Sequence, residues 1–128
     1  MAFWVEKRIL CVDNTEDDRE LFKLFLTEAG YTVESAHSFS DAMQRIENSQ
    51  FDLYLFNVSL ADEVGFELLE KVQNIDSVVP VVVCTADVRV STRQRVMQAG
   101  AQVFFTKPID YDALVETIAQ LLPSHYLQ

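Results

Sequence analysis

The stretch that decides the fold is Ile9-Leu10-Cys11-Val12-Asp13, an apolar run that ends in a polar residue, as three later runs also do. Such runs, without alternating polar positions, are typical of strands buried on both faces of a parallel sheet. The later runs are Leu53-Tyr54-Leu55-Phe56 before Asn57, Val81-Val82-Val83-Cys84 before Thr85, and Val103-Phe104-Phe105-Thr106 before Lys107. The polar residues at the four ends would meet at one rim, where open α/β sheets bind ligands.

Helical patterns separate these runs. Leu21, Leu24 and Phe25 recur at helical spacing after an acidic turn, and Gly30 is suited to end that helix. Residues 31–36 predict a further strand. The remaining helices are expected after a cap at Ser40, through Gly65, across residues 87–99, and after a cap at Asp110. The alternation predicts an α/β fold, a doubly wound five-stranded parallel sheet with five helices.

The length of 128 residues predicts one domain over 1–128, with its core at about 7–122 and a loosely packed tail at 123–128. The stretch from Val78 to Cys84 is the richest in β-branched residues and predicts a central strand. Cys11 and Cys84 lie in apolar runs, so they are expected to be buried and reduced. A reducing, cytoplasmic location suits them.

The charge balance narrows the class of partner. Twenty acidic residues face ten basic ones, for a net charge of -10. This excess argues against nucleic acid, whose phosphates need a basic surface, and against anionic membranes. No apolar stretch reaches the roughly 20 residues of a membrane-spanning helix. His37 and His125 have no ligand spacing and are expected at the surface.

The chain resembles the receiver domain of two-component response regulators, the CheY-like family, from about Lys7 to Leu122. The segments that carry the resemblance are Ile9 to Asp13, Asn57 through Gly65-Phe66-Glu67-Leu68-Leu69, Thr85-Ala86, Ala99-Gly100-Ala101 and Lys107-Pro108. In that family an aspartate pair after the first strand binds Mg²⁺, and an aspartate after the third accepts a phosphoryl group from a sensor kinase. A Thr or Ser and a Lys contact the phosphoryl oxygens.

The family pattern is broken at its reactive positions. Asp13 is kept, but Asn14 stands for the second metal-binding aspartate and Asn57 for the phosphoacceptor. Thr85 and Lys107 are kept, and Phe104 occupies the aromatic position that switches together with Thr85 in the family. Ala61 replaces a usual proline. Several departures together favour natural divergence over an engineered change at Asn57 alone.

These changes predict a degenerate pseudo-receiver. An amide cannot form an acyl phosphate as a carboxylate does. Mg²⁺ prefers carboxylate oxygens, so no metal site is expected and Mg²⁺ binding should be weak or absent. We expect Lys107 to pair with Asp13, and Asn14 and Asn57 to donate hydrogen bonds to Asp13. The expected function is a non-catalytic protein-interaction module, and no enzyme.

The resemblance also implies an interaction surface on the fourth helix, fifth strand and fifth helix, for a sensor kinase, another signalling protein or a second copy. The candidate contact residues are Arg89, Arg93 and Arg95 on the fourth helix and Asp110, Asp112 and Glu116 on the fifth. A solvated basic face on an acidic protein is the simpler interpretation of the arginines.

Two other functions stay open. One is a phosphorelay receiver that uses another acid, Asp13, Asp52 or Asp62. The other is a flavodoxin-like domain that binds a small ligand, although the loop Asp13-Asn14-Thr15-Glu16-Asp17 has none of the glycines that cradle a phosphate.

Overall fold

The computed structural model describes residues 3–4, 6–59, 63–122 and 126–127. Its main sheet has five parallel strands in the order β3-β2-β4-β5-β6. The strands are β2 (Arg8–Val12), β3 (Thr32–Ala36), β4 (Leu53–Phe56), β5 (Val81–Thr85) and β6 (Val103–Thr106). The helices are α1 (Glu16–Glu28), α2 (Phe39–Asn48), α3 (Val64–Ile75), α4 (Val90–Gln98) and α5 (Tyr111–Leu121). The predicted α/β fold class is confirmed.

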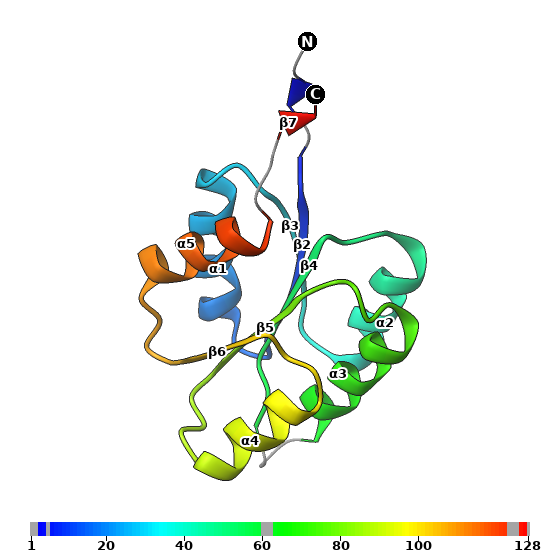
Figure 1. Ribbon diagram of the computed structural model, residues 1–128, viewed down its shortest axis with the longest axis vertical. Helices are drawn as coiled ribbons and strands as arrows, with labels where there is room; N and C mark the ends of the chain where they lie inside the picture. The colour runs from blue at the N-terminus through cyan, green and yellow to red at the C-terminus, as the bar shows by residue number, and fades with distance from the viewer. Residues whose placement is uncertain (1–2, 5, 60–62, 123–125, 128) are drawn as a thin grey trace.

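The helices form two layers around the sheet. Figure 1 shows α1 and α5 on one face and α2, α3 and α4 on the other. The middle strand is β4, with β2 and β5 beside it. The stretch from Val78 to Cys84 supplies β5, an interior strand paired on both sides, as its composition predicted. The strand itself starts at Val81.

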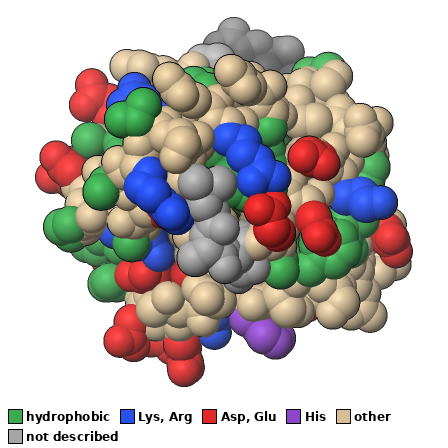
Figure 2. All heavy atoms as spheres, turned by 90° about the horizontal axis from the view of Figure 1, so that it is seen from below, with side chains coloured by type: hydrophobic (Ala, Val, Ile, Leu, Met, Phe, Trp, Pro, Cys, Tyr) green, Lys and Arg blue, Asp and Glu red, His purple; other side chains and the backbone are tan. Residues whose placement is uncertain are grey.

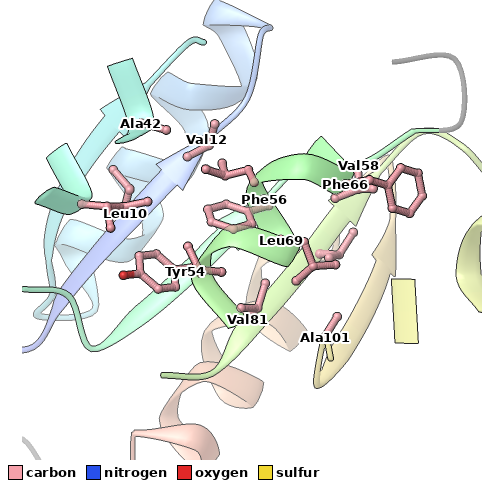
Figure 3. Packing of buried hydrophobic residues seen from close by; sticks show 14 of the residues in the cluster. Leu10, Val12, Ala42, Tyr54, Phe56, Val58, Phe66, Leu69, Val81 and Ala101 are labelled. Atoms are coloured by element: carbon pink, nitrogen blue, oxygen red, sulfur yellow. The ribbon is translucent and has the colours of Figure 1, made fainter. Parts of the chain in front are cut away.

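Successive residues of the inner strands point into two different cores. In β4, Tyr54 and Phe56 belong to the cluster under α2, α3 and α4, and Leu53 and Leu55 belong to the cluster under α1 and α5. All four are buried, as expected for strands covered on both faces. Figure 3 shows the first cluster, to which Tyr54, Phe56 and Leu69 of α3 belong. Both faces of the sheet are therefore closed, and the carboxyl ends of the strands are left as the place for a site.

Helix α1 forms where expected but turns a different face inward. Its buried residues are Phe22 and Leu26, while Leu21 is 39% and Leu24 is 51% exposed. The apolar residues cover more than one face of this helix, so their spacing alone did not fix which stripe packs on the sheet. This rotation matters for the site, because it carries Asp18 toward the sheet.

Two helix starts also differ from the sequence prediction. The cap of α2 is Ser38, whose Oγ accepts a hydrogen bond from the Asp41 amide at 3.2 Å, and Ser40 lies inside the helix. Helix α4 begins at Val90, because Asp87 is held in a turn before it. The predicted cap of α5 is confirmed, since Asp110 accepts a hydrogen bond from the Ala113 amide at 3.1 Å.

Both chain ends contribute to a small second sheet. Strand β1 (Phe3–Trp4) pairs antiparallel with β7 (Tyr126–Leu127) at the top of Figure 1. Within the tail expected at 123–128, residues 126–127 form one strand of this pair, and residues 123–125 and 128 lie outside the described residues. No helix in the described part of the chain is long and apolar enough to cross a membrane.

Candidate functional site at the carboxyl ends of the strands

The strand register brings the sequence-predicted residues to one rim. Asp13 follows β2, Asn57 follows β4, Thr85 ends β5 and Lys107 follows β6. The amide of Asn57 donates to the carbonyl of Val12 at 2.9 Å, and the amide of Lys107 donates to the carbonyl of Thr85 at 2.8 Å. The Lys107–Pro108 peptide bond is cis. Figure 2 views this end of the molecule and shows acidic and basic side chains close together on it.

An ion triad occupies the rim. The Nζ atom of Lys107 lies 2.7 Å from Oδ2 of Asp13 and 2.7 Å from Oδ2 of Asp18. The side chain of Asp13 is 1% exposed, that of Lys107 15% and that of Asp18 28%. The pairing of Lys107 with Asp13 was predicted from the sequence, but the second carboxylate was not. The ammonium group is therefore shared by two acids rather than free to meet a ligand.

Burial and charge act in opposite directions on Lys107. Burial alone would lower the pKa of its ammonium group, but hydrogen bonds and attraction from Asp13 and Asp18 outweigh burial and raise that pKa. Lys107 therefore stays charged at neutral pH. Below the rim, burial raises the pKa of the Cys84 thiol from 9.0 to about 12, and it also raises the pKa of Cys11. Both cysteines are free, buried thiols in the structure.

The two amides interact with each other and not with Asp13. Nδ2 of Asn57 donates to Oδ1 of Asn14 over 3.5 Å. The expected donation to Asp13 is wrong for the described residues, where the second oxygen of Asp13 accepts the backbone amide of Thr15 at 2.9 Å. Asn14 is exposed at the loop surface, so its amide reaches Asn57 more easily than it reaches the buried carboxylate.

A metal ion would find poor ligands at this rim. Both oxygens of Asp13 already accept hydrogen bonds, from Thr15 and Lys107. The neighbouring amides of Asn14 and Asn57 carry no charge, and Mg²⁺ is held in proteins chiefly by carboxylates. Within the described ranges, no group of three or more His, Cys, Asp or Glu side chains is placed to hold a metal ion. The donor set does not fit the metal that the family binds.

Helix α3 starts very close to Asn57. A Cβ atom on Gly65 would lie 2.5 Å from the Asn57 carbonyl oxygen, which is closer than two such atoms approach in proteins. Glycine is therefore required at position 65 for the first turn of α3 to reach the end of β4. A small cavity of about 50 Å³ remains there, lined by residues that include Asn14, Asn57, His37 and Gly65.

A second polar cluster holds Thr85. Its hydroxyl accepts a hydrogen bond from the backbone amide of Asp87 at 3.0 Å. The Asp87 side chain is only 6% exposed and accepts hydrogen bonds from Thr92 at 2.8 Å and from Arg89 at 2.6 Å. It also accepts one from Ser59 in the loop after β4, at 3.3 Å. Asp87 therefore ties together the loop after β4, the end of β5 and the start of α4.

The predicted contact residues of α4 do not lie on one surface. Arg95 pairs with Glu63 at 2.9 Å and stacks over Phe66 with its guanidinium carbon 3.8 Å from the ring centre, so it faces α3. Arg89 was predicted on α4 but is the residue before it, and it pairs with Asp87. Arg93 lies 5.8 Å from the ring centre of Phe104 on β6. Of these three arginines, Arg93 alone has no ion pair to a described residue.

On α5, the three predicted acids differ in their contacts. Asp110 caps the helix through its hydrogen bond to Ala113. Asp112 and Glu116 are exposed, and no salt bridge to either is found among the described residues. Ala61 and Asp62 lie in residues 60–62, and His125 lies in 123–125, all outside the described residues. His37 is at the surface as expected, 3.3 Å from Asp41.

Sequence reasoning missed Asp18 and Asp87. A signal for Asp18 existed, because it stands four residues before Phe22, and residues at that spacing share one face of a helix. The choice of Leu21 and Leu24 as the apolar stripe hid this relation. The signal for Asp87 was weaker, since an aspartate two residues after a strand is a common turn residue.

These features define an α/β protein with a charged site at the carboxyl ends of its parallel strands. The family model described as response regulator receiver domain matches residues 9–119. The chain belongs to this family. Receiver domains are generally signalling modules of two-component systems and interact with protein partners such as sensor kinases.

Known relatives agree with this assignment. The chain is 32% identical over 114 residues to the transcriptional regulatory protein ZraR of Salmonella typhimurium, which covers 89% of this chain and 26% of ZraR. A CheY-like receiver domain protein from Methanospirillum hungatei matches with a TM-score of 0.86 at 32% identity, over 94% of this chain and 96% of that one. The response regulator TrrA of Thermotoga maritima, solved in complex with Mg²⁺-BeF, matches with a TM-score of 0.79 at 25% identity, over 90% of this chain and 98% of that one.

Proposed function

We propose that this chain is a pseudo-receiver, a protein-interaction module of two-component signalling that works without aspartyl phosphorylation and has no enzyme activity. The observation that carries the proposal is Asn57 at the acceptor position, on the same rim where Asp13 and Asp18 hold the Lys107 ammonium group at 2.7 Å each. The nucleophile of the phosphorylation reaction is missing, and the cation that would meet the phosphoryl oxygens is engaged elsewhere.

The chemistry of position 57 is the first support. A carboxylate oxygen attacks phosphorus and forms an acyl phosphate, whereas the nitrogen and oxygen of a neutral amide are poor nucleophiles. In this chain the Asn57 side chain donates to Asn14 instead. Thr85, which the family resemblance places against the phosphoryl group, uses its hydroxyl to hold the Asp87 amide.

Weak or absent Mg²⁺ binding is the second part of the proposal. Asp13 supplies one charge where the family pattern has three, and that charge is already balanced by Lys107. A divalent cation would have to displace the ammonium group from a nearly buried carboxylate. Because the donor set does not fit the ion, no reaction step through a metal is proposed.

Other acids are poorly placed to replace the acceptor. Both oxygens of Asp13 are engaged by hydrogen bonds, and its side chain is 1% exposed. Asp52 precedes β4, so it lies at the opposite end of the sheet from the rim. Asp62 lies outside the described residues. A glycine-rich phosphate loop for a small ligand is absent from the sequence after β2.

The partner that we propose is a protein, a sensor kinase, another signalling protein or a second copy, bound through the face of α4, β6 and α5 in the cytoplasm. For a second copy, Arg93 of one chain would meet Asp112 or Glu116 of the other across a two-fold axis. Dimers seen by sedimentation that weaken with salt and are lost in Arg93→Glu would support this pairing. A monomer at every salt concentration would contradict it.

The decisive experiment for the proposal is intact-mass spectrometry after incubation with acetyl phosphate and Mg²⁺. We expect no base-labile phosphoryl adduct on the native chain. A base-labile adduct would overturn the proposal, and peptide mapping would then identify the acid that accepted the group. A thermal-shift screen with Mg²⁺, nucleotides and flavins tests the small-ligand alternative, for which we expect no stabilisation.

A further inference from the structure

A cavity of about 310 Å³ lies at the opposite end of the sheet from the rim site. It is bounded by the end of α2, the start of β4 and the end of α3, and its lining includes Phe51, Asp52, Tyr54, Ile75 and Asp76. None of its lining residues is basic. The proposed pseudo-receiver function does not use this cavity.

The hydroxyl of Tyr54 is the unexplained group in this cavity. Tyr54 is 4% exposed, and its ring stacks on Phe56 with the ring centres 5.4 Å apart. Figure 3 shows the hydroxyl directed away from Phe56, Leu69 and Val81. No described residue forms a hydrogen bond with it, although buried tyrosine hydroxyls usually find a partner. The free hydroxyl therefore offers one donor and one acceptor to a molecule in the cavity.

Two carboxylates, Asp52 and Asp76, line the same cavity as this hydroxyl, and each has an oxygen without a hydrogen bond to the described residues. Oδ2 of Asp52 accepts the Arg8 amide at 2.8 Å, and Oδ1 of Asp76 accepts the Val78 amide at 3.1 Å. The other oxygen of each accepts no hydrogen bond from the described part of the chain. Burial, and then the charge of Asp76, raises the pKa of the Tyr54 hydroxyl, which agrees with a carboxylate close to the ring.

The charge of Arg8, whose amide binds Asp52, does not neutralise the cavity. The guanidinium of Arg8 lies over the Phe51 ring, 5.2 Å from its centre, and is paired with Glu34 on β3. The cavity therefore combines a negative charge with aromatic walls, a combination that attracts ammonium groups. At its mouth Ile75 is 57% exposed, which leaves apolar surface for a ligand to cover.

We propose that this cavity is a binding site for a small primary amine with a short alkyl chain. The ammonium group donates hydrogen bonds to Asp52 and Asp76 and to the hydroxyl oxygen of Tyr54, so that all three of its N–H bonds have acceptors. The alkyl chain lies against Phe51 and Ile75. An anion would be repelled by the two carboxylates, and a neutral molecule would gain no electrostatic attraction from them.

The test is a titration followed by amide chemical shifts in two-dimensional NMR, with n-pentylamine as the probe and 1-pentanol as its neutral counterpart. We expect saturable shifts that centre on residues 49–54 and 75–78 with the amine, and none with the alcohol. Asp76→Asn keeps the acceptor for the Val78 amide, and Tyr54→Phe keeps the ring. Each should weaken binding about tenfold, the value of one hydrogen bond to a charged group.

The matched control is Asp112→Asn, which removes the same charge from the exposed surface of α5. It should leave the affinity unchanged, because the cavity lies away from α5. Shifts scattered over many acidic residues, equal binding of 1-pentanol, or an equal loss in Asp112→Asn and Asp76→Asn would overturn the proposal. Scattered shifts or an equal loss in the two variants would mean that the amine is attracted only by the overall negative charge of the protein, and equal binding of 1-pentanol would mean that the carboxylates do not select the ammonium group.

Discussion

Replacing Lys107 with Met removes the cation of the rim triad and leaves Asp13 charged and nearly buried. The Asp13 side chain is 1% exposed, so water cannot take the place of the ammonium group. Breaking a buried ion pair in this way costs about 3–5 kcal/mol. The hydrogen bond from the Thr15 amide remains, which places the expected loss of unfolding free energy near the lower limit, at about 3 kcal/mol.

Variants of the two carboxylates of the triad should differ in stability from Lys107→Met. Asp18 is 28% exposed, so Asp18→Asn should cost only about 1 kcal/mol. Adding Asp13→Asn to Lys107→Met removes the unpaired buried charge, so the double variant should be more stable than Lys107→Met alone. The order of stabilities therefore reports the burial of Asp13, and not only the number of charges.

Urea unfolding at pH 7, followed by circular dichroism, measures these differences. Lys71→Met is the matched control, because Lys71 is an exposed lysine of α3 and its loss changes the net charge equally. Lys107→Met within about 1 kcal/mol of Lys71→Met would refute the reasoning, since exposed pairs contribute no more than that. So would a double variant less stable than Lys107→Met.

Three further predictions follow from other contacts. Gly65→Ala should destabilise the fold by about 1–3 kcal/mol in urea and shift the Asn57 amide resonance, because its Cβ would lie 2.5 Å from the Asn57 carbonyl oxygen; an unchanged midpoint would contradict this. Asp87→Ala should lower the free energy of unfolding by about 1–3 kcal/mol, because it leaves the hydroxyl of the fully buried Thr92 without its acceptor. A loss smaller than that of Thr92→Val would contradict this. Burial raises the pKa of Cys84 from 9.0 to about 12, so the thiol ionises in the unfolded chain before it ionises in the folded one. The free energy of unfolding is therefore unaffected by this group below pH 9.0 and falls between pH 9.0 and about 12, by up to about 1.4 kcal/mol per pH unit. Cys84→Ala should make this alkaline decline shallower in urea titrations, and an identical slope would contradict the assignment.

The five-stranded sheet was predictable because the apolar runs of the sequence clearly indicate strands. β-Branched and aromatic runs without polar alternation are typical of strands in a parallel sheet, and the polar residues that end them then meet at one rim. The runs of β4 and β5 are fully buried, whereas β6 is a partly exposed edge strand. The close approach of Lys107 to Asp13 followed from this topology and from simple charge pairing. The order and spacing of these motifs also indicated the receiver-domain family, and the family model matches residues 9–119.

The rotation of α1 was not predictable in the same way. Leu21 and Leu24 fit a helical stripe as well as Phe22 and Leu26 do, and packing against the sheet selected the second pair. That selection decides which acid of the first turn reaches Lys107. The contact between Arg95 and Glu63 depends on how α3 and α4 lie together, which local sequence does not encode. Details that depend on packing between elements were therefore the ones missed.

The most direct measurement compares the native chain with Asn14→Asp/Asn57→Asp, in acetyl phosphate and Mg²⁺, by intact mass under identical conditions. The double variant restores the carboxylates of the family pattern at both positions, so it shows whether the rest of the rim can still support the reaction. We predict that the native chain keeps its unmodified mass, whatever the double variant does. A phosphoryl adduct on the native chain that disappears in alkali would contradict the claim that its rim cannot accept the group.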